Sequence, residues 1–192
     1  DGARKALEAL AVHHHEPWPN LTLAERALRN RLRAHGRQLG DALDKTRGTQ
    51  SIKRLTGECA YEHWHRMLFA RFLAENDLLI ESEHGVAITL DECQELAREQ
   101  GTDWLELASC YAVGMLQDIF RPDDPVLAVS LPPETSSALE DLLKALPADV
   151  FTAGDSLGWC YQFWQAERKE EVNASGDKIG ADELPAATQL FT

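Results

Sequence analysis

A row of arginines is the most prominent group in this sequence that could do chemistry. Arg26, Arg29, Arg33 and Arg37 recur every three or four residues, so a helix of 3.6 residues per turn brings them onto one face. A row of guanidinium groups can bind the phosphate backbone of a nucleic acid. The alternative is a solvated face that pairs with acidic parts of the same protein. We predict DNA binding through these four side chains, and the alternative stays open.

The loop of residues 45–50 is a second candidate for anion binding. It reads Lys-Thr-Arg-Gly-Thr-Gln, and its backbone N–H groups could hold an anion at the start of the next helix, where Ser51 fits an N-cap. The loop lacks the G-x-x-x-x-G-K-[ST] spacing of a phosphate-binding loop. Nucleotide hydrolysis therefore receives little support.

Other reactive residue types form no recognisable site. The consecutive His13, His14 and His15 would point about 100° apart on a helix and could not share a metal ion. The sequence has no C-x-x-C pair, so we expect its four cysteines to be buried free thiols. It also has no G-x-S-x-G, H-E-x-x-H or G-x-G-x-x-G. We predict no catalytic and no metal-binding residue in this chain.

Charge is distributed unevenly over the 192 residues, whose net charge is −13. Residues 26–73 hold 11 Lys and Arg against 4 Asp and Glu, a net of +7, whereas residues 74–192 hold 6 against 24, a net of −18. The basic stretch can meet phosphate, and the acidic stretch would repel nucleic acid. No run approaches the roughly 20 apolar residues of a membrane span. We expect a cytoplasmic protein with no membrane partner.

The elements that carry these candidates are predominantly helical. Thr22 with Glu25 and Thr89 with Glu92 form two capping boxes, each of which predicts a helix start. Only residues 78–90 alternate like a short β-hairpin, and no internal repeat is evident. The predicted fold is mainly α, a multi-helix, bundle-like domain followed by a C-terminal linker helix. Apolar periodicity predicts its helices at about residues 22–44, 51–76, 89–101, 103–120 and 134–146.

The C-terminal stretch resembles part of a known enzyme family. Residues 155–165, DSLGWCYQFWQ, resemble the D-x-L-G-x-x-Y-x-[FY] helix that precedes the catalytic domain of large bacterial adenine-specific DNA methyltransferases. Residues 178–192 look like the lead into their first cofactor-contacting segment, where an aromatic-Thr-Pro sequence touches S-adenosylmethionine. Phe191 and Thr192 match its first two positions. The resemblance implies that both contact the cofactor in the full-length parent, whereas the fragment alone binds no cofactor.

The N-terminal half is similar to the same family. Residues 27–30, 48–50 and 64–76 resemble the helical amino-terminal region of the methylases of BREX (PglX-like) phage-defence clusters and related restriction–modification proteins. Catalysis in that family rests on a Gly-containing cofactor loop and an Asn-Pro-Pro-[Tyr/Phe] segment that holds a flipped adenine, and neither is in this sequence. The resemblance implies methyl transfer to DNA adenine by the parent, not by this chain. The implied partners are DNA, the parent's catalytic domain and other defence-system proteins.

The predicted organisation has three parts. Residues 1–20 form an N-terminal extension, residues 21–154 a helical domain, and residues 155–192 a linker helix leading into a catalytic methyltransferase domain that this chain does not contain. We expect part of the aromatic surface of the linker helix to be left for that domain. The alternative is a self-standing, non-enzymatic, acidic helical module that binds another protein or mimics DNA, which the charge of residues 74–192 motivates.

Overall fold

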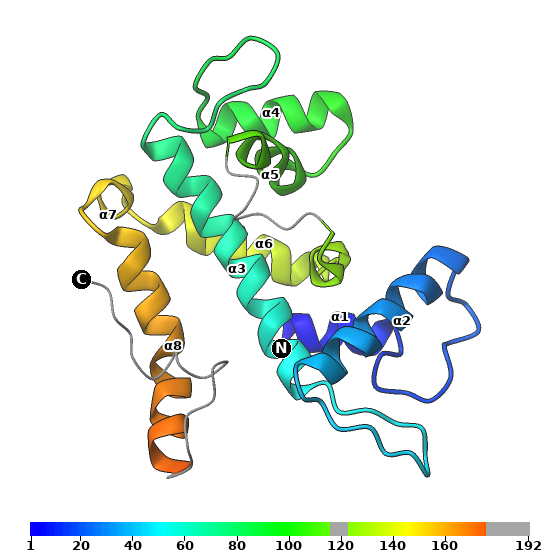
Figure 1. The fold of residues 1–192 in the computed structure, drawn as a ribbon. Coiled ribbons are helices and arrows are strands. Elements are labelled where there is room, and N and C mark those ends of the chain that lie inside the picture. Colours follow the sequence, from blue (N-terminus) through cyan, green and yellow to red (C-terminus); the bar gives the residue numbers. More distant parts are fainter. Residues whose placement is uncertain (116–122, 176–192) are drawn as a thin grey trace. The chain divides into compact units, whose positions relative to one another are not determined.

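The chain folds into helices joined by loops and tight turns (Figure 1). The computed structural model describes residues 1–115 and 123–175. It forms two compact units with a boundary between Leu146 and Pro147. The first unit holds α1 (Gly2–Ala9), α2 (Leu23–Gln38), α3 (Lys53–Glu75), α4 (Leu90–Gln100), α5 (Trp104–Met115), the 3₁₀ helix η1 (Pro125–Ala128) and α6 (Pro133–Ala145), and the second holds α7 (Ala148–Thr152) and α8 (Ser156–Ser175).

The prediction of a mainly α fold is confirmed. Within the described ranges no β-strand forms, and the hairpin expected in residues 78–90 contains one isolated bridge, between Ile80 and Ala87. A second isolated bridge joins Leu43 and Gln50. None of the helices in these ranges combines the length and the apolar character needed to cross a lipid bilayer.

Both predicted capping boxes form and begin α2 and α4. The hydroxyl oxygens of Thr22 and Thr89 each accept a hydrogen bond from the backbone N–H of Glu25 and Glu92, both at 3.2 Å. Each glutamate in return accepts the backbone N–H of its threonine, at 2.7 Å. These bonds satisfy N–H groups that a first helical turn leaves unpaired. The pKa of Glu25 is lowered by hydrogen bonds from the hydroxyl and the backbone N–H of Thr22, and the pKa of Glu92 by hydrogen bonds from the backbone N–H and the hydroxyl of Thr89. Gly101, with φ of 66°, ends α4 as the sequence predicts.

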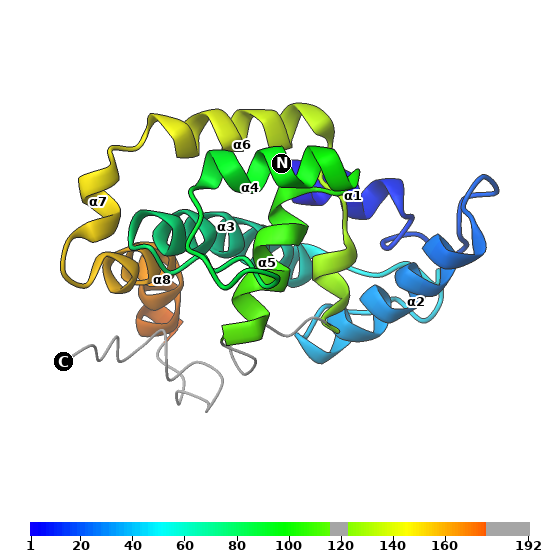
Figure 2. The ribbon, with the colours of Figure 1, turned by 90° about the horizontal axis from the view of Figure 1, so that it is seen from above.

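Helix α3 is the central element of the first unit and contacts α1, α2, α4, α5, α6 and η1. In Figure 1, α1 and α2 lie near its N-terminal end and α4 and α5 near its C-terminal end, while the turned view of Figure 2 places α6 behind it. A helix with apolar residues on several sides is stable where neighbours cover all of them. Its buried apolar residues are Leu55, Cys59, Met67, Leu68, Phe69, Ala70 and Leu73.

The first 20 residues are part of this core, although the sequence predicts an extension there. Ala3, Ala6 and Leu7 have the i, i+3, i+4 spacing that gives α1 one apolar face, and all three are buried. They belong to one cluster with Leu32 of α2 and Leu55 of α3. Helix α1 therefore helps to close the core of the first unit.

The connections α2–α3 and α3–α4 share one backbone design, which we call hairpin 1 (residues 43–50) and hairpin 2 (residues 80–87). Each residue of the first connection corresponds to the residue 37 positions later: α2 ends at Gln38 and α3 at Glu75, and both hairpins contain one bridge. The sequence shows no such repeat, because residues 35–53 and 72–90 share one identical position, Gly48 and Gly85.

The hydrogen bonds of the two hairpins also correspond. The carboxylates of Asp44 and Glu81 each accept the backbone N–H groups two and three residues later. Gly48 and Gly85, with φ of 68° and 67°, donate their N–H to the carbonyl oxygens of Asp44 and Glu81 at 2.7 Å and 2.9 Å. Positive φ explains why both hairpins have glycine at this position. An acidic residue followed four positions later by glycine thus sets both turns.

The second unit contains α7 and α8. Helix α8 begins at Ser156, next to the position at which the sequence predicts a linker helix. Phe163 is 82% exposed and Trp164 is half-buried, so this helix keeps aromatic surface uncovered, as expected. The predicted cofactor contacts Phe191 and Thr192 lie outside the described residues.

Candidate functional site

The four arginines of the predicted DNA-binding row lie on α2, and Arg29 is the most deeply placed. It is 4% exposed. Its guanidinium donates hydrogen bonds to the carbonyl oxygens of Ala11 at 2.9 Å, His14 at 2.6 Å and His15 at 3.0 Å. Arg29 lies on the buried side of α2, three residues from the fully buried Leu32. Its guanidinium has almost no surface to offer a phosphate.

Arg33 and Arg37 join α2 to the loop after α1 and to hairpin 1. Arg33 donates to the carbonyl oxygens of Val12 at 2.7 Å, His14 at 2.6 Å and Gly48 at 2.9 Å. The amide of Gln50 donates to the carbonyl oxygen of Arg33 at 3.0 Å and accepts from Arg37 at 3.1 Å. Arg37 is exposed, so part of its guanidinium remains available to solvent.

Arg26 completes what we call the arginine clamp, defined as Arg26, Arg29 and Arg33. It donates to the carbonyl oxygens of Leu21 at 2.9 Å and Pro19 at 3.1 Å. The clamp thus pairs cations with neutral backbone carbonyls, which satisfies the acceptors of an irregular segment.

The electrostatics of the clamp reflect its burial. Burial lowers the pKa of Arg29 and of Arg33, and the positive charges of Arg29 and Arg37 lower the pKa of Arg33 further. The ion pairs formed within the described ranges include neither side chain. The prediction of a solvent-facing arginine row is wrong for Arg29. The alternative of a solvated face paired with acidic residues fails for the same side chain.

The predicted anion site in residues 45–50 is occupied by the chain itself. The carboxylate of Asp44 accepts the backbone N–H groups of Thr46 at 2.9 Å and Arg47 at 3.1 Å. The start of α3 is likewise held by Asp41, which accepts the N–H groups of Arg54 at 2.9 Å and Leu55 at 3.0 Å. The N–H groups expected to hold an external anion thus bind two aspartates of the same chain.

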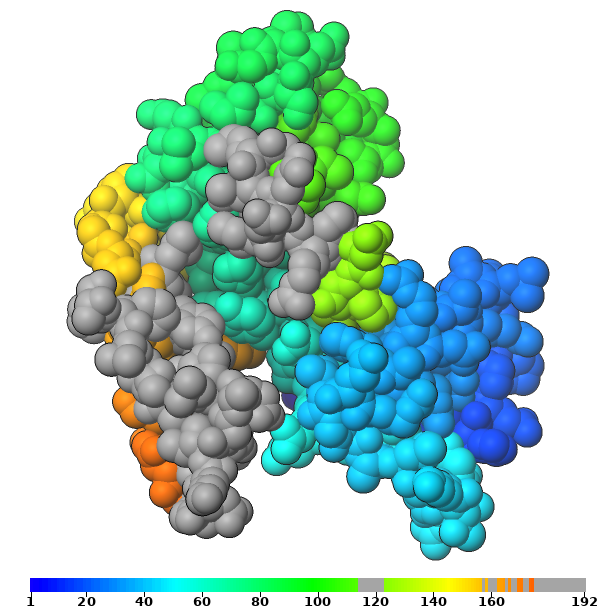
Figure 3. Space-filling view, in the orientation of Figure 1, coloured from blue at the N-terminus to red at the C-terminus, as the bar shows by residue number. Residues whose placement is uncertain are grey.

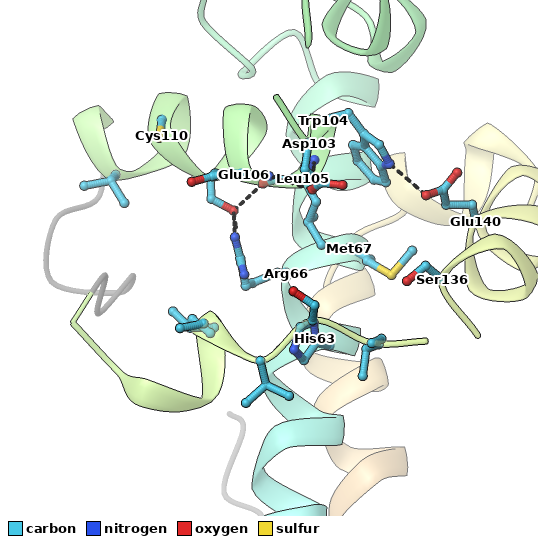
Figure 4. A pocket seen from close by; sticks show the side chains of 17 residues that line it. His63, Arg66, Met67, Asp103, Trp104, Leu105, Glu106, Cys110, Ser136 and Glu140 are labelled. Atoms are coloured by element: carbon cyan, nitrogen blue, oxygen red, sulfur yellow. Dashed lines mark hydrogen bonds between the residues drawn. The ribbon is translucent and has the colours of Figure 1, made fainter. Parts of the chain in front are cut away.

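A cleft of about 760 Å³ opens between α3, α5, the segment from η1 to Leu131, and α6 (Figure 4). Its polar groups include His63 and Arg66 of α3 and Glu140 of α6. The indole N–H of Trp104 donates to Glu140 at 3.0 Å, which joins α5 to α6 across one wall. No sequence pattern predicts this cleft, because its lining comes from segments far apart in the chain.

Hydrogen bonds connect several of the polar groups on one side of the cleft. Arg66 donates to the hydroxyl oxygen of Ser109 through Nε at 3.0 Å and Nη2 at 2.8 Å. Ser109 in turn donates its proton to the carbonyl oxygen of Leu105 at 2.6 Å, so the acceptor of this proton is a backbone carbonyl and not a base. Burial lowers the pKa of His63 and of Arg66, and the charge of Arg66 lowers the pKa of His63 further.

The cysteines and the one acidic cluster carry no reactive arrangement in the described ranges. Cys59 and Cys93 are buried free thiols, as predicted, and burial raises their pKa to about 12 and about 11. Cys110 is free but exposed, contrary to the expectation for all four cysteines. Ligand atoms of Glu81, Glu83 and His84 lie within 4.8 Å of one another. Because the Glu81 carboxylate already accepts bonds from both neighbours, this cluster builds hairpin 2.

Comparison with known proteins gives one relationship. The chain is 33% identical over 92 residues to an adenine-specific methyltransferase, BrxX, of Escherichia coli O9:H4 (strain HS). The aligned stretch covers 46% of this chain and 8% of the relative's length. No protein-family model matches the sequence, and no solved structure matches it. Part of the chain is thus related to an adenine-specific methyltransferase.

Proposed function

We propose that this chain is the N-terminal helical region of a DNA adenine-N6 methyltransferase of a phage-defence or restriction–modification system. The observation that supports this most is the 33% identity over 92 residues to an adenine-specific methyltransferase. The fold agrees with an accessory role, because residues 1–115 and 123–175 form no sheet of the kind on which a Rossmann-like cofactor domain is built.

In this proposal the chemistry belongs to residues outside the chain. The sequence contains no Asn-Pro-Pro segment to hold a flipped adenine and no Gly-rich cofactor loop. In the full-length protein, Phe191 and Thr192 contact S-adenosylmethionine, and the helical units dock the catalytic domain and help to hold DNA. Such a protein acts in the cytoplasm, with other proteins of the defence system as further partners.

The test is methyl transfer by the product of the complete reading frame. We expect the frame to encode an Asn-Pro-Pro-[Tyr/Phe] segment beyond Thr192. We also expect the purified protein to form N6-methyladenine in duplex DNA from labelled S-adenosylmethionine. The matched control replaces the Asn of that segment by Ala, which removes the hydrogen bond to the adenine amine. A complete protein that neither binds the cofactor nor methylates adenine would refute the proposal.

The charge of residues 74–192, a net of −18, favours a second candidate function. In this candidate the chain is a self-standing module whose acidic surface binds a basic protein or mimics DNA. A stop codon directly after Thr192 would support it and exclude the methyltransferase. A reading frame that continues into a methyltransferase domain would exclude it.

A further inference from the structure

Hairpin 1 projects from the first unit as a narrow, basic extension. It lies beyond the ends of α2 and α3 in the ribbon and forms the cyan projection of the space-filling view (Figures 1 and 3). Residues 43–47 are all exposed, and the turn carries Lys45 and Arg47. These two cations are therefore exposed on a projecting hairpin.

Hairpin 1 carries two cations, Lys45 and Arg47, and one carboxylate, that of Asp44, and it lies in a basic stretch of the chain. Residues 26–54 hold 9 Lys and Arg against 2 Asp, a net of +7, which leaves −20 for the rest of the chain. Both aspartates are engaged with backbone N–H groups, Asp41 at the start of α3 and Asp44 in the turn. The ion pairs formed within the described residues do not include Lys45 or Arg47. Hairpin 1 is thus an exposed projection with a net positive charge in an acidic chain.

The backbone of hairpin 1 is held in place before any partner binds. Arg33 donates to the carbonyl oxygen of Gly48 at 2.9 Å, and the backbone N–H of Gln50 donates to the carbonyl oxygen of His13 at 2.9 Å. These bonds fix the base of the hairpin to α2 and to the loop after α1. A binding loop that is already ordered loses less conformational entropy on association.

Hairpin 2 shows that the cations of hairpin 1 are not needed to form this turn. The two hairpins have the same hydrogen bonds and the same glycine conformation. The positions of Lys45, Thr46 and Arg47 are taken in hairpin 2 by Ser82, Glu83 and His84. Since the turn forms with either charge, Lys45 and Arg47 are not required for folding of the hairpin.

We propose that Lys45 and Arg47 on hairpin 1 bind the phosphate backbone of duplex DNA. The inference rests on the proposed function, which makes DNA the polyanion that this protein meets, and it moves the contact from the arginine clamp to the hairpin. A lysine ammonium binds phosphate as a point charge, and a guanidinium can bind two phosphate oxygens at once. Such contacts position a protein on DNA without reading its sequence.

The experiment measures binding of the 192-residue chain to a short fluorescent duplex by anisotropy, from about 50 mM to about 200 mM salt. The variant is Lys45→Gln with Arg47→Gln. The matched control, Arg98→Gln with Lys144→Gln, removes the same charge from exposed positions on α4 and α6.

We expect the hairpin variant to reduce the slope of log affinity against log salt by about 2 and to weaken binding about tenfold or more at low salt. The control should bind within about twofold of wild type, since it removes no phosphate contact.

Four results would overturn the inference. The first is a wild-type chain that binds no duplex at low salt, and the second is a hairpin variant that binds duplex as tightly as wild type. The third is a control variant that loses as much affinity as the hairpin variant, and the fourth is equally tight, hairpin-dependent binding of poly-L-glutamate. The last result would assign the hairpin to an acidic protein surface instead. Methylation by the complete protein separates the two proposals. An active enzyme with hairpin-independent DNA binding refutes only the hairpin, and hairpin-dependent binding by a protein that never methylates adenine refutes only the proposed function.

Discussion

Replacement of Arg29 tests whether the arginine clamp holds the segment between α1 and α2. Arg29→Ala removes hydrogen bonds to three backbone carbonyls, those of Ala11, His14 and His15. A hydrogen bond to a charged group contributes about 1.5–3 kcal/mol, and the cost of burying the guanidinium offsets part of that sum. The carbonyl of His14 keeps a bond from Arg33. We therefore expect Arg29→Ala to lower the free energy of unfolding by about 2–4 kcal/mol.

Two further variants make the measurement specific. Arg29→Lys keeps the charge but not the planar fork, so it should lose about 1–3 kcal/mol. Arg47→Ala removes an exposed arginine and should change the free energy of unfolding by about 0.5 kcal/mol or less. Urea unfolding followed by tryptophan fluorescence measures all three, and Trp18, whose indole bonds the carbonyl of Glu8, reports on the same segment.

Salt dependence separates the clamp from an ordinary ion pair. The acceptors are neutral carbonyls, so the loss in Arg29→Ala should be nearly the same at low and high salt, whereas a surface ion pair weakens as salt rises. If Arg29→Ala is no more destabilising than Arg47→Ala, the hydrogen bonds of Arg29 do not stabilise the segment between α1 and α2. A loss that disappears at high salt would contradict the pairing with neutral carbonyls, because it would indicate a charged partner.

Three further predictions concern titration, backbone conformation and thiol reactivity. Burial lowers the pKa of His63 below its ordinary 6.5. The stability contributed by neutral His63 is therefore complete above pH 6.5 and is lost as pH falls towards the folded pKa. Urea unfolding at a series of pH values should show that the free energy of unfolding falls less for His63→Gln than for wild type over that window. Gly48→Ala should destabilise more than Gly85→Ala in thermal unfolding, because both have positive φ but an added Cβ meets the His15 ring only at Gly48. Iodoacetamide at mild alkaline pH, followed by peptide mass mapping, should label the exposed Cys110 and leave the buried Cys59 unmodified until the protein unfolds; equal labelling of the two in folded protein would contradict the structure.

Local signals in the sequence were sufficient for the starts of α2 and α4 and for the end of α4. The capping boxes at Thr22 and Thr89 and the glycine at Gly101 act within one helical turn, and the structure forms all three. The mainly α class, and α3 as a helix buried on several sides, also follow from apolar spacing alone. The helix predicted to run to about residue 44 ends at Gln38, because Gly40 takes a φ of 95° and starts the connection to hairpin 1.

The role of the arginines could not be predicted in the same way. Helical periodicity places Arg29 and Arg33 near one another, but it does not say what covers that face. The cover is the irregular segment after α1, whose carbonyls at Ala11 and His14 point at the guanidinium groups. A contact between residues some 15 positions apart, through backbone atoms that every residue has, leaves no pattern in the side chains.

By itself the sequence determined where α2 and α4 begin, which faces are apolar and how charge divides along the chain, since these depend on neighbouring residues. Only the tertiary structure decided which arginines are buried and that one turn design occurs twice. Residues 35–53 and 72–90 share a single identity, yet a carboxylate and a glycine four positions later produce the same hydrogen bonds in both. The same backbone geometry thus forms with Lys-Thr-Arg and with Ser-Glu-His between the acidic residue and the glycine. Those intervening residues are therefore free to make hairpin 1 basic and hairpin 2 acidic.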